Sequence, residues 1–365
     1  MNKKIIISLL IISIILICYY NYFFNVTNNS DSIINKPTDN ITNNSIIIVN
    51  KPTDNITNKL NNINTKNNAI YVYDRKNNIM IKEFIPLYIR ISLKLMYNLN
   101  LCKYNKLIKK ISTKQGEKFN RQSSKKYIEK FIKLYNINID ETEKNIIEYK
   151  TFNEFFARKL KYNLRPIFKL YNNNVAICPA DSRVLVFNNI LHMGNFWIKG
   201  NNLSLEKLFS SEYERLIQNY KDCSICISRL APQDYHRWHL PIRGIIIKHT
   251  LLDGNLCSVN PILINKNINI LAENKRIITE IISPEFGKVI IIPIGTIFVG
   301  SIKIILEENI MYNKGEPHGY FQFGGSTVLL LFEKNRIMFD QDLIDNSKNG
   351  IETLVNVNTS LGVSY

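Results

Sequence analysis

Ser326 has the surroundings of a serine that could act on its own chain. It follows Gly324 and Gly325 and precedes an apolar run, Val328–Phe332. Glycines admit backbone conformations that other residues resist, so a hydroxyl placed after them can attack the preceding carbonyl once a base removes its proton. A glycine-containing turn before a buried strand explains the same residues without chemistry, so the other stretches must decide.

Two histidines supply the base. His236 and His239 lie three residues apart in a chain that has only five histidines. Imidazole carries protons near neutral pH, and no third ligand stands at a spacing that would favour a metal. Cys223 and Cys226 have metal-like spacing but lie in a strand-like run, where positions i and i+3 point to opposite faces. We therefore expect acid–base chemistry, no metal, and cysteines that are ordinary, mostly buried thiols.

A carboxylate completes the set. Asp181 lies in a turn, Pro179–Ser182, directly before a strand-like run. Carboxylate, imidazole and hydroxyl form the triad that activates a serine, here in the order Asp, His, Ser. An Asp that caps its own turn is the structural alternative. No Gly-x-Ser-x-Gly motif surrounds Ser326, so an α/β-hydrolase is not expected.

Two kinds of element must position these groups. Between residues 80 and 150 apolar residues such as Leu87, Ile91 and Leu95 recur at helical spacing. After residue 175, short β-branched runs alternate with turn residues, which indicates an antiparallel β-rich core. These runs are 182–187, 223–230, 244–250, 268–271, 276–282, 288–294, 296–305 and 327–332. The predicted fold class is α+β, with N-terminal membrane-associated helices followed by this core.

The N-terminal region divides by composition. Residues 5–24 are almost wholly apolar, and about 20 such residues span a bilayer as a helix, so we predict a signal anchor at 1–24. Residues 25–68 form an Asn/Thr-rich linker, and 69–150 form a helical membrane-associating region before a core at 151–365. The net charge of +17, without a nucleic-acid motif, favours an anionic membrane as partner and excludes nucleic acid.

Taken together, the motifs resemble those of the phosphatidylserine decarboxylase family, whose members cut themselves and carry a pyruvoyl group. The matching stretches are 151–160 with 165–166, then 179–181, 198–200, 230–239, 293–295 with 299–302, and 315–316 through 323–327. Two positions depart from the family pattern: Ser182 replaces a usual glycine, and Trp238 replaces a phenylalanine or other apolar residue.

The resemblance implies a joint task for the three groups. His239 would take the proton of Ser326, while Asp181 orients the imidazole. The hydroxyl would then attack the Gly325 carbonyl and cut the Gly325-Ser326 bond. Ser326 would end as the pyruvoyl group, the covalent cofactor of the family.

The same resemblance implies the reaction that follows. The pyruvoyl group would form a Schiff base with phosphatidylserine, and loss of CO2 would give phosphatidylethanolamine. His236 would lie near the departing carboxylate or protonate the product carbon. The β chain, 1–325, and the α chain, 326–365, would stay together, and the family suggests a homodimer of this pair. The Gly-Gly-Ser-Thr form of the cleavage site and the predicted anchor favour an endomembrane location, with the mitochondrial inner membrane as the alternative.

Other functions are compatible with parts of this pattern. A pyruvoyl decarboxylase could act on a soluble amino acid, but the anchor and basic helices argue against it. An inactive lipid-binding homologue is disfavoured because all motif residues are present. A serine hydrolase with the same triad predicts an intact chain, whereas the decarboxylase predicts a cut before Ser326.

Overall fold

The computed structural model describes most of the chain from residue 70 onward. The described residues are 70–83, 85, 87–98, 105–195, 203–210, 213–296, 301–324 and 326–365. The predicted anchor at 1–24, the linker at 25–68 and Gly325 lie outside these ranges. Within the described part, no helix has the length and apolar character needed to cross a bilayer.

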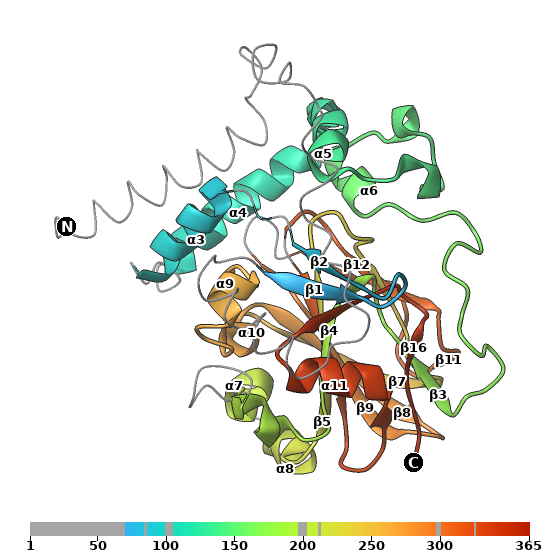
Figure 1. The fold of residues 1–365 in the computed structure, drawn as a ribbon. Coiled ribbons are helices and arrows are strands. Elements are labelled where there is room, and N and C mark those ends of the chain that lie inside the picture. Colours follow the sequence, from blue (N-terminus) through green and yellow to red (C-terminus); the bar gives the residue numbers. More distant parts are fainter. Residues whose placement is uncertain are drawn as a thin grey trace.

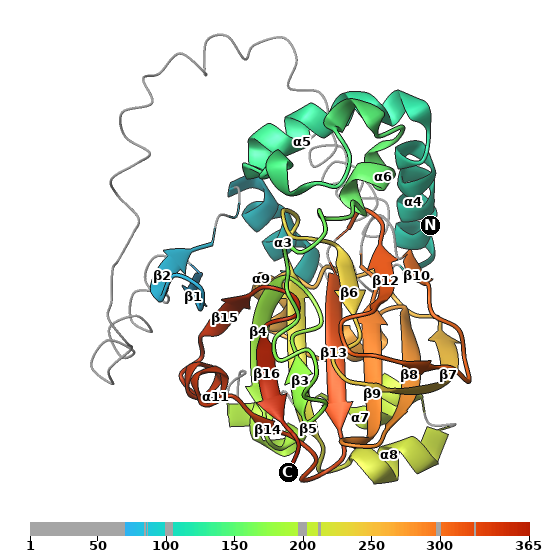
Figure 2. The same cartoon turned by 90° about the vertical axis from the view of Figure 1, so that its right-hand side faces the viewer.

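A ten-stranded sheet forms the centre of the molecule (Figure 2). In spatial order its strands are β11 (Met311–Tyr312), β7 (Gly244–Leu252), β8 (Arg276–Ser283), β9 (Gly287–Ile294), β13 (Ser326–Phe332), β5 (Ser224–Leu230), β4 (Ser182–Phe187), β15 (Glu352–Val355), β1 (Tyr71–Asp74) and β2 (Ile79–Lys82). Neighbouring strands are antiparallel except for β1 and β15, which are parallel. The prediction of an α+β fold with an antiparallel β-rich core is confirmed.

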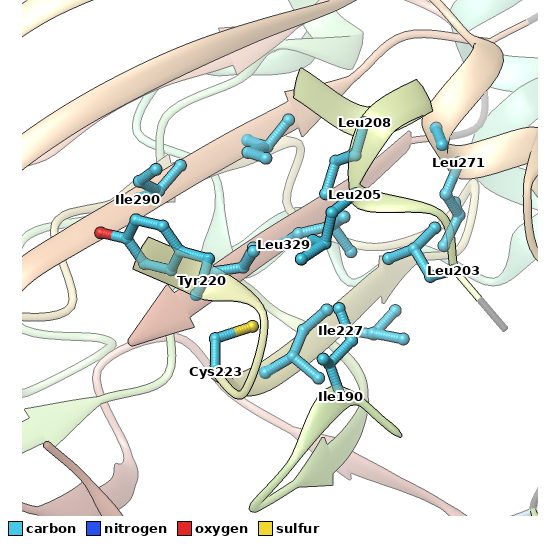
Figure 3. Close-up of a cluster of buried hydrophobic side chains, with 14 of the residues drawn as sticks. Ile190, Leu203, Leu205, Leu208, Tyr220, Cys223, Ile227, Leu271, Ile290 and Leu329 are labelled. Carbon is cyan, nitrogen blue, oxygen red and sulfur yellow. The ribbon is translucent and has the colours of Figure 1, made fainter. Parts of the chain in front are cut away.

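Strand β13 is central because its side chains are apolar on both faces. Leu329 and Leu331 belong to one buried cluster, whereas Val328 and Leu330 belong to the other. Figure 3 shows the first cluster, in which Leu329 lies among side chains of the covering helices. These helices are α7 (Leu205–Phe209), α8 (Glu214–Tyr220), α9 (Pro261–Ile264) and α10 (Ile270–Glu273).

Two small sheets and one helix cover other parts of the large sheet. The first small sheet has the order β10 (Ile302–Ile304), β12 (Pro317–Phe321) and β6 (Arg237–His239), and the second has the order β14 (Met338–Phe339), β16 (Ser360–Val363) and β3 (Val175–Ile177). Helix α11 (Gln341–Lys348) is fixed on β4, because Ser347 Oγ accepts a hydrogen bond from the Val186 amide at 2.9 Å.

A helical layer lies at one end of the sheet (Figures 1 and 2). It contains α3 (Leu87–Asn98), α4 (Asn105–Phe119), α5 (Ile128–Tyr135) and α6 (Phe152–Phe156), with 3-10 helices at Gln122–Tyr127, Ile139–Glu141 and Ile146–Glu148. A further 3-10 helix at Ile190–Asn195 follows β4. An aromatic cluster joins this layer to the sheet end, because Phe323 packs against Phe119 and Phe152.

The helical prediction for 69–150 is wrong at its start, where β1 and β2 form a hairpin on the sheet edge. The side chain of Asp74 accepts hydrogen bonds from the amides of Lys76 and Asn77, and Asn78 adopts a φ of +56°. This local turn chemistry folds the two short apolar runs back on each other instead of continuing a helix. 

Two smaller expectations also need correction. The run 268–271, predicted as a strand, instead leads into α10, where Asn267 Oδ1 accepts a hydrogen bond from the Asn269 amide. Cys178, Cys223 and Cys226 are free and buried, and Cys223 and Cys226 lie in clusters on opposite faces of the sheet, as predicted. Cys257, however, is disulfide-bonded, a pairing for which the sequence spacing gives no signal.

Candidate active site

Ser326 is the first residue of β13, paired with Leu230 at the end of β5. Its side chain is fully buried, and its hydroxyl has no hydrogen-bond partner among the described residues. Gly324, two residues earlier, has a φ of +147°, a conformation that side-chain-bearing residues rarely adopt. A buried hydroxyl without a partner is costly, which is expected of a group kept available for chemistry.

The backbone before Ser326 is held from the helical layer. The side-chain oxygen of Asn153 in α6 accepts a hydrogen bond from the Phe323 amide at 3.0 Å. Asn153 in turn donates to Asn120 Oδ1 at 2.8 Å. The Phe323 ring packs 5.2 Å from that of Phe156, measured between centroids. Helix α6 therefore fixes both the backbone and the side chain of Phe323.

His236 faces the same aromatic ring. It follows β5 through the turn 231–235, and its ring centroid lies 3.9 Å from that of Phe156. Its Nδ1 lies 2.9 Å from the Asp234 carbonyl oxygen, and because a carbonyl only accepts, Nδ1 carries the proton. Nε2 is then a lone-pair acceptor, buried and without a partner among the described residues. Burial lowers the pKa of His236 to about 3, so the imidazole is neutral near pH 7.

His239 ends β6 with both ring nitrogens occupied. Nδ1 donates to the Gly315 carbonyl at 2.7 Å, so Nε2 accepts from the Tyr235 hydroxyl at 3.1 Å. Burial lowers the pKa of His239, whereas the Gly315 carbonyl and the charge of Asp181 act in the opposite direction. Gly315 has a φ of +84°, and a Cβ at this position would lie 2.3 Å from Ile167 Cδ1, so a side chain here would be strained and would displace Ile167.

Asp181 lies near His239 but makes its hydrogen bonds elsewhere. Arg165 Nη2 donates to Asp181 Oδ2 at 2.9 Å, and the Val357 amide donates to Oδ1 at 2.7 Å. The orienting hydrogen bond that the sequence predicts from Asp181 to His239 is made by Gly315 instead. In this uncut chain Asp181 acts on the imidazole through its charge.

Two cavities border these groups. One of about 350 Å³ is lined by Asp181, Arg165 and Tyr235. The other, of about 740 Å³, is lined by His239, Tyr235 and Arg165 and by residues of the connection after α6. His239 and Tyr235 therefore face a space that can admit a small polar group, whereas Ser326 and His236 lie in the packed interior.

A buried charge cluster lies beside the same strand ends. Arg183 of β4 and Arg229 of β5 face each other in the sheet, and Arg229 is also opposite Thr327. Glu83 lies between the two guanidinium groups, 3.0 Å from Arg183 Nε and 2.9 Å from Arg229 Nη2. Asp234 also pairs with Arg183. Since the Asp234 carbonyl orients His236, the cluster is continuous with the candidate site.

The sequence interpretation missed several residues that shape the site. They are Glu83, Asn153, Arg165, Tyr235 and Gly315, of which all but Glu83 lie within the quoted motifs. Their presence in those motifs was a usable signal. The partners of Asn153 and Gly315, however, lie 75 or more positions away in the sequence, so the motifs do not show these contacts. Across the described residues, no cluster of three or more His, Cys, Asp or Glu could hold a metal ion.

Comparison with known proteins adds independent information. The sequence model of a family described as phosphatidylserine decarboxylase matches residues 152–359. The "Phosphatidylserine decarboxylase proenzyme" of Chlamydia muridarum is 42% identical over 242 residues, which cover 66% of this chain and 79% of the relative.

Longer eukaryotic relatives match over more of this chain. "Phosphatidylserine decarboxylase proenzyme 2" of Komagataella phaffii is 43% identical over 80% of this chain, and the protein of that name from Oryza sativa is 41% identical over 81%. The chain spans only 30% and 48% of the lengths of these two relatives.

Proposed function

We propose that this chain, which belongs to the phosphatidylserine decarboxylase family, converts phosphatidylserine to phosphatidylethanolamine and CO2 after cutting itself before Ser326. The observation that carries the proposal is the buried, unpartnered hydroxyl of Ser326 at the start of β13. Ser326 lies three residues after Phe323. The ring of Phe156 packs against both Phe323 and the neutral imidazole of His236.

Self-cleavage needs only groups of this chain and water. Ser326 Oγ attacks the carbonyl carbon of Gly325, the peptide C–N bond breaks, and an ester forms while the amine of residue 326 is freed. Removal of the α-proton then breaks the Cβ–O bond, releasing Gly325 as a carboxylate and leaving dehydroalanine. Addition of water and loss of ammonia give the pyruvoyl group. His239 serves as the base, and Asp181 stabilises the imidazolium that forms.

His239 must exchange one hydrogen bond to act. Its Nε2 accepts from Tyr235 in the uncut chain, so the tyrosine hydroxyl has to turn away or pass on the proton. The Gly315 carbonyl keeps Nδ1 protonated throughout, which leaves Nε2 as the basic atom. Asp181, held by Arg165, places a negative charge near the imidazole without competing for Nδ1.

The surroundings of Ser326 fit a pyruvoyl group at this position. Ser326 is fully buried at the start of β13, beside β5, its hydroxyl has no partner among the described residues, and His236 Nε2 is an unused acceptor. When formed, the pyruvoyl group supplies a ketone that draws electrons from the bond to the departing carboxylate. His236 would hold or deliver the proton that replaces CO2, with Nδ1 fixed by the Asp234 carbonyl.

The two products of cleavage stay together. Strand β13, in the α chain 326–365, is hydrogen-bonded on both sides to strands of the β chain 1–325, β5 and β9. All seven of its residues are buried. Separating the chains would expose the centre of the core. From the family resemblance alone, we also propose a homodimer of this αβ unit.

The enzyme works at a membrane because its substrate is a lipid. Residues 1–24 act as a signal anchor, 25–68 as a linker, and helices of the region 69–150 contact an anionic bilayer in an endomembrane compartment. On α3, Ile91, Leu95 and Tyr97 are exposed, as a helix that lies on a membrane requires. Replacing Ile91 and Leu95 by serine should weaken binding to phosphatidylserine vesicles, and unchanged binding would remove this role of α3.

Intact-mass measurement of the purified protein tests the central claim. We expect a fragment that begins at position 326 with pyruvoyl in place of serine, and no such fragment from the Ser326→Ala variant. His236→Ala should cut normally and fail to release CO2 from phosphatidylserine. A wild-type chain that stays uncut would refute the mechanism, and release of CO2 from free amino acids instead of phosphatidylserine would favour the soluble-substrate alternative.

A further inference from the structure

The connection between α6 and β3 combines positive charge with exposed aromatic residues. Residues 159–171, named here the docking segment, contain three lysines and one arginine and no carboxylate. Four of its large apolar side chains are exposed, and Tyr162 and Tyr171 are 92% and 94% exposed. The other two are Phe168 and Leu170. Figure 1 shows this connection running along the outside of the molecule. Such clustering on a surface indicates an interaction site.

The docking segment is held in place by the core. Lys314, only 2% exposed, donates from its ammonium group to the carbonyls of Lys169 at 2.9 Å and Asn172 at 2.7 Å. Asn358 supplies a carbonyl for the Phe168 amide at 2.9 Å. The aromatic side chains are thus presented to the outside by a fixed backbone, which lowers the entropy lost when they bind a surface.

The same segment forms one wall of the cavity that His239 lines. Its members Tyr162, Arg165 and Leu170 border this cavity of about 740 Å³. Ile305, which directly follows β10 and is 45% exposed, also borders the cavity. A surface that received the docking segment would therefore lie next to the cavity and to His239.

The charges decide which surface this is. Lys159, Lys161 and Lys169 are exposed, whereas Arg165 is engaged by Asp181 and Glu141. Exposed lysines next to tyrosines suit the interface of an anionic bilayer, where ammonium groups meet headgroups and aromatic rings lie at headgroup level. A nucleic-acid groove would instead be expected to have arginines free for phosphate contacts.

We propose that the docking segment 159–171 lies on the anionic bilayer and places the His239 cavity against the lipid headgroups. The partner is a lipid surface, and the contact is separate from that proposed for α3. This inference rests on the proposed function in one respect: the reason for docking is that the lipid substrate enters from that bilayer. Binding itself does not depend on catalysis.

Two variants separate the charge and apolar contributions. Lys169→Glu reverses one charge, and because one charge near an anionic surface contributes roughly fivefold in affinity, we expect roughly 30-fold weaker binding to phosphatidylserine vesicles. Binding to neutral phosphatidylcholine vesicles should not change. Tyr171→Ser should weaken binding to both vesicle types. Neither residue lines the His239 cavity, so self-cleavage should be unaffected.

Matched controls lie on the other face of the sheet. Lys221→Glu, at the end of α8, and Leu191→Ser, in the 3-10 helix after β4, make the same kinds of change at exposed positions. Both should bind vesicles like the wild type. Full-length protein should be used in flotation assays with each vesicle type.

A second measurement uses short-chain phosphatidylserine dispersed in water. We expect wild-type rates of CO2 release from both docking-segment variants, because no bilayer has to be bound. Equal binding of Lys169→Glu and Lys221→Glu to anionic vesicles would overturn the proposal. Docking-segment variants that lost as much activity on dispersed phosphatidylserine as on vesicles would also overturn it. If no protein releases CO2 but the difference in vesicle binding persists, the proposed function fails and the docking surface stands.

Discussion

Replacing Glu83 by glutamine should test whether the buried charge cluster supports the active site. Glu83 is 8% exposed, and its carboxylate accepts hydrogen bonds from Arg229 Nη1 and Nη2 at 3.1 and 2.9 Å. It also lies 3.0 Å from Arg183 Nε. Glutamine keeps the shape and removes the charge, so two guanidinium groups on adjacent strands would face each other without the carboxylate between them.

The expected cost follows from what each arginine keeps. Removing one partner of a buried ion pair costs about 3–5 kcal/mol, because a charge is left uncompensated. Arg183 retains Asp234, and Arg229 retains Glu352, which places the expected loss at the lower end, about 3 kcal/mol. That is a large part of the roughly 5–15 kcal/mol by which domains are stable.

Urea unfolding provides the assay. Both proteins should carry Ser326→Ala, so that neither is cut and the two unfold as the same single chain. Glu273→Gln is the matched control, because Glu273 pairs with Lys207 at the surface, with side chains 36% and 53% exposed. It should cost less than about 1 kcal/mol. A loss below about 1 kcal/mol for Glu83→Gln would refute the reasoning.

The effect should also depend on pH in one direction. The pKa of Glu83 is lowered by the charges of Arg229 and Arg183, which outweigh its burial. A carboxyl group with a lowered folded-state pKa stabilises the protein above its unfolded pKa and loses this contribution as the pH falls through the folded value. The difference between the two proteins should therefore shrink below about pH 4.

Three further predictions concern the residues around the site. Burial lowers the pKa of His236 to about 3 from 6.5, so its contribution to stability should be fully present above pH 6.5 and fall by about 2 kcal/mol by pH 5, as the unfolded histidine takes up a proton. Burial also lowers the pKa of His318 to about 3, so the measurement is the difference in urea stability between Ser326→Ala and the same chain with His236→Ala; a difference that stays the same between pH 7 and 5 would contradict this. Gly315→Ala should slow self-cleavage at least about tenfold on an intact-mass time course, whereas Gly287→Ala, with a similar φ of +69° in a turn distant in sequence from the site, should cut at the wild-type rate. Asn153→Ala should cost about 1–3 kcal/mol by leaving the Phe323 amide unpaired and should slow the cut; normal cutting would show that α6 does not position the cleavage turn.

The sequence was most informative where one pattern has one physical cause. The apolar run after Ser326 predicts a buried strand, and β13 is buried at every position. Short β-branched runs separated by turn residues predicted most of the antiparallel strands, because branched side chains favour strands and turn residues end them. The run 268–271 failed because a four-residue apolar stretch does not distinguish a strand from a short helix, and here an asparagine side chain started a helical turn.

The geometry of the site was less predictable than its membership. The motifs name Asp181, His239 and Ser326, but they do not say which oxygen orients the imidazole. Gly315 does so with its backbone carbonyl, at a position whose φ of +84° favours glycine, and backbone carbonyls leave no trace in a motif. Arg165 captures Asp181 for a similar reason, because the two residues meet only after β4 and the preceding loop are in place.

Glu83 presents the strongest case of a contact that sequence patterns do not reveal, and its coupling to Arg229 can be measured. Arg229→Met alone leaves Glu83 with one buried partner, and Glu83→Gln alone leaves Arg229 with one. The double variant removes both charges and keeps the Arg183–Asp234 pair intact, so its loss should be about 1–3 kcal/mol smaller than the sum of the single losses. If the hairpin supported the sheet by packing alone, the two losses would add, because glutamine and methionine keep most of the side-chain volume. Coupling of that size would mean that a carboxylate outside the matched region 152–359 holds β4 and β5 together, and β5 pairs with Ser326 and leads into the turn before His236.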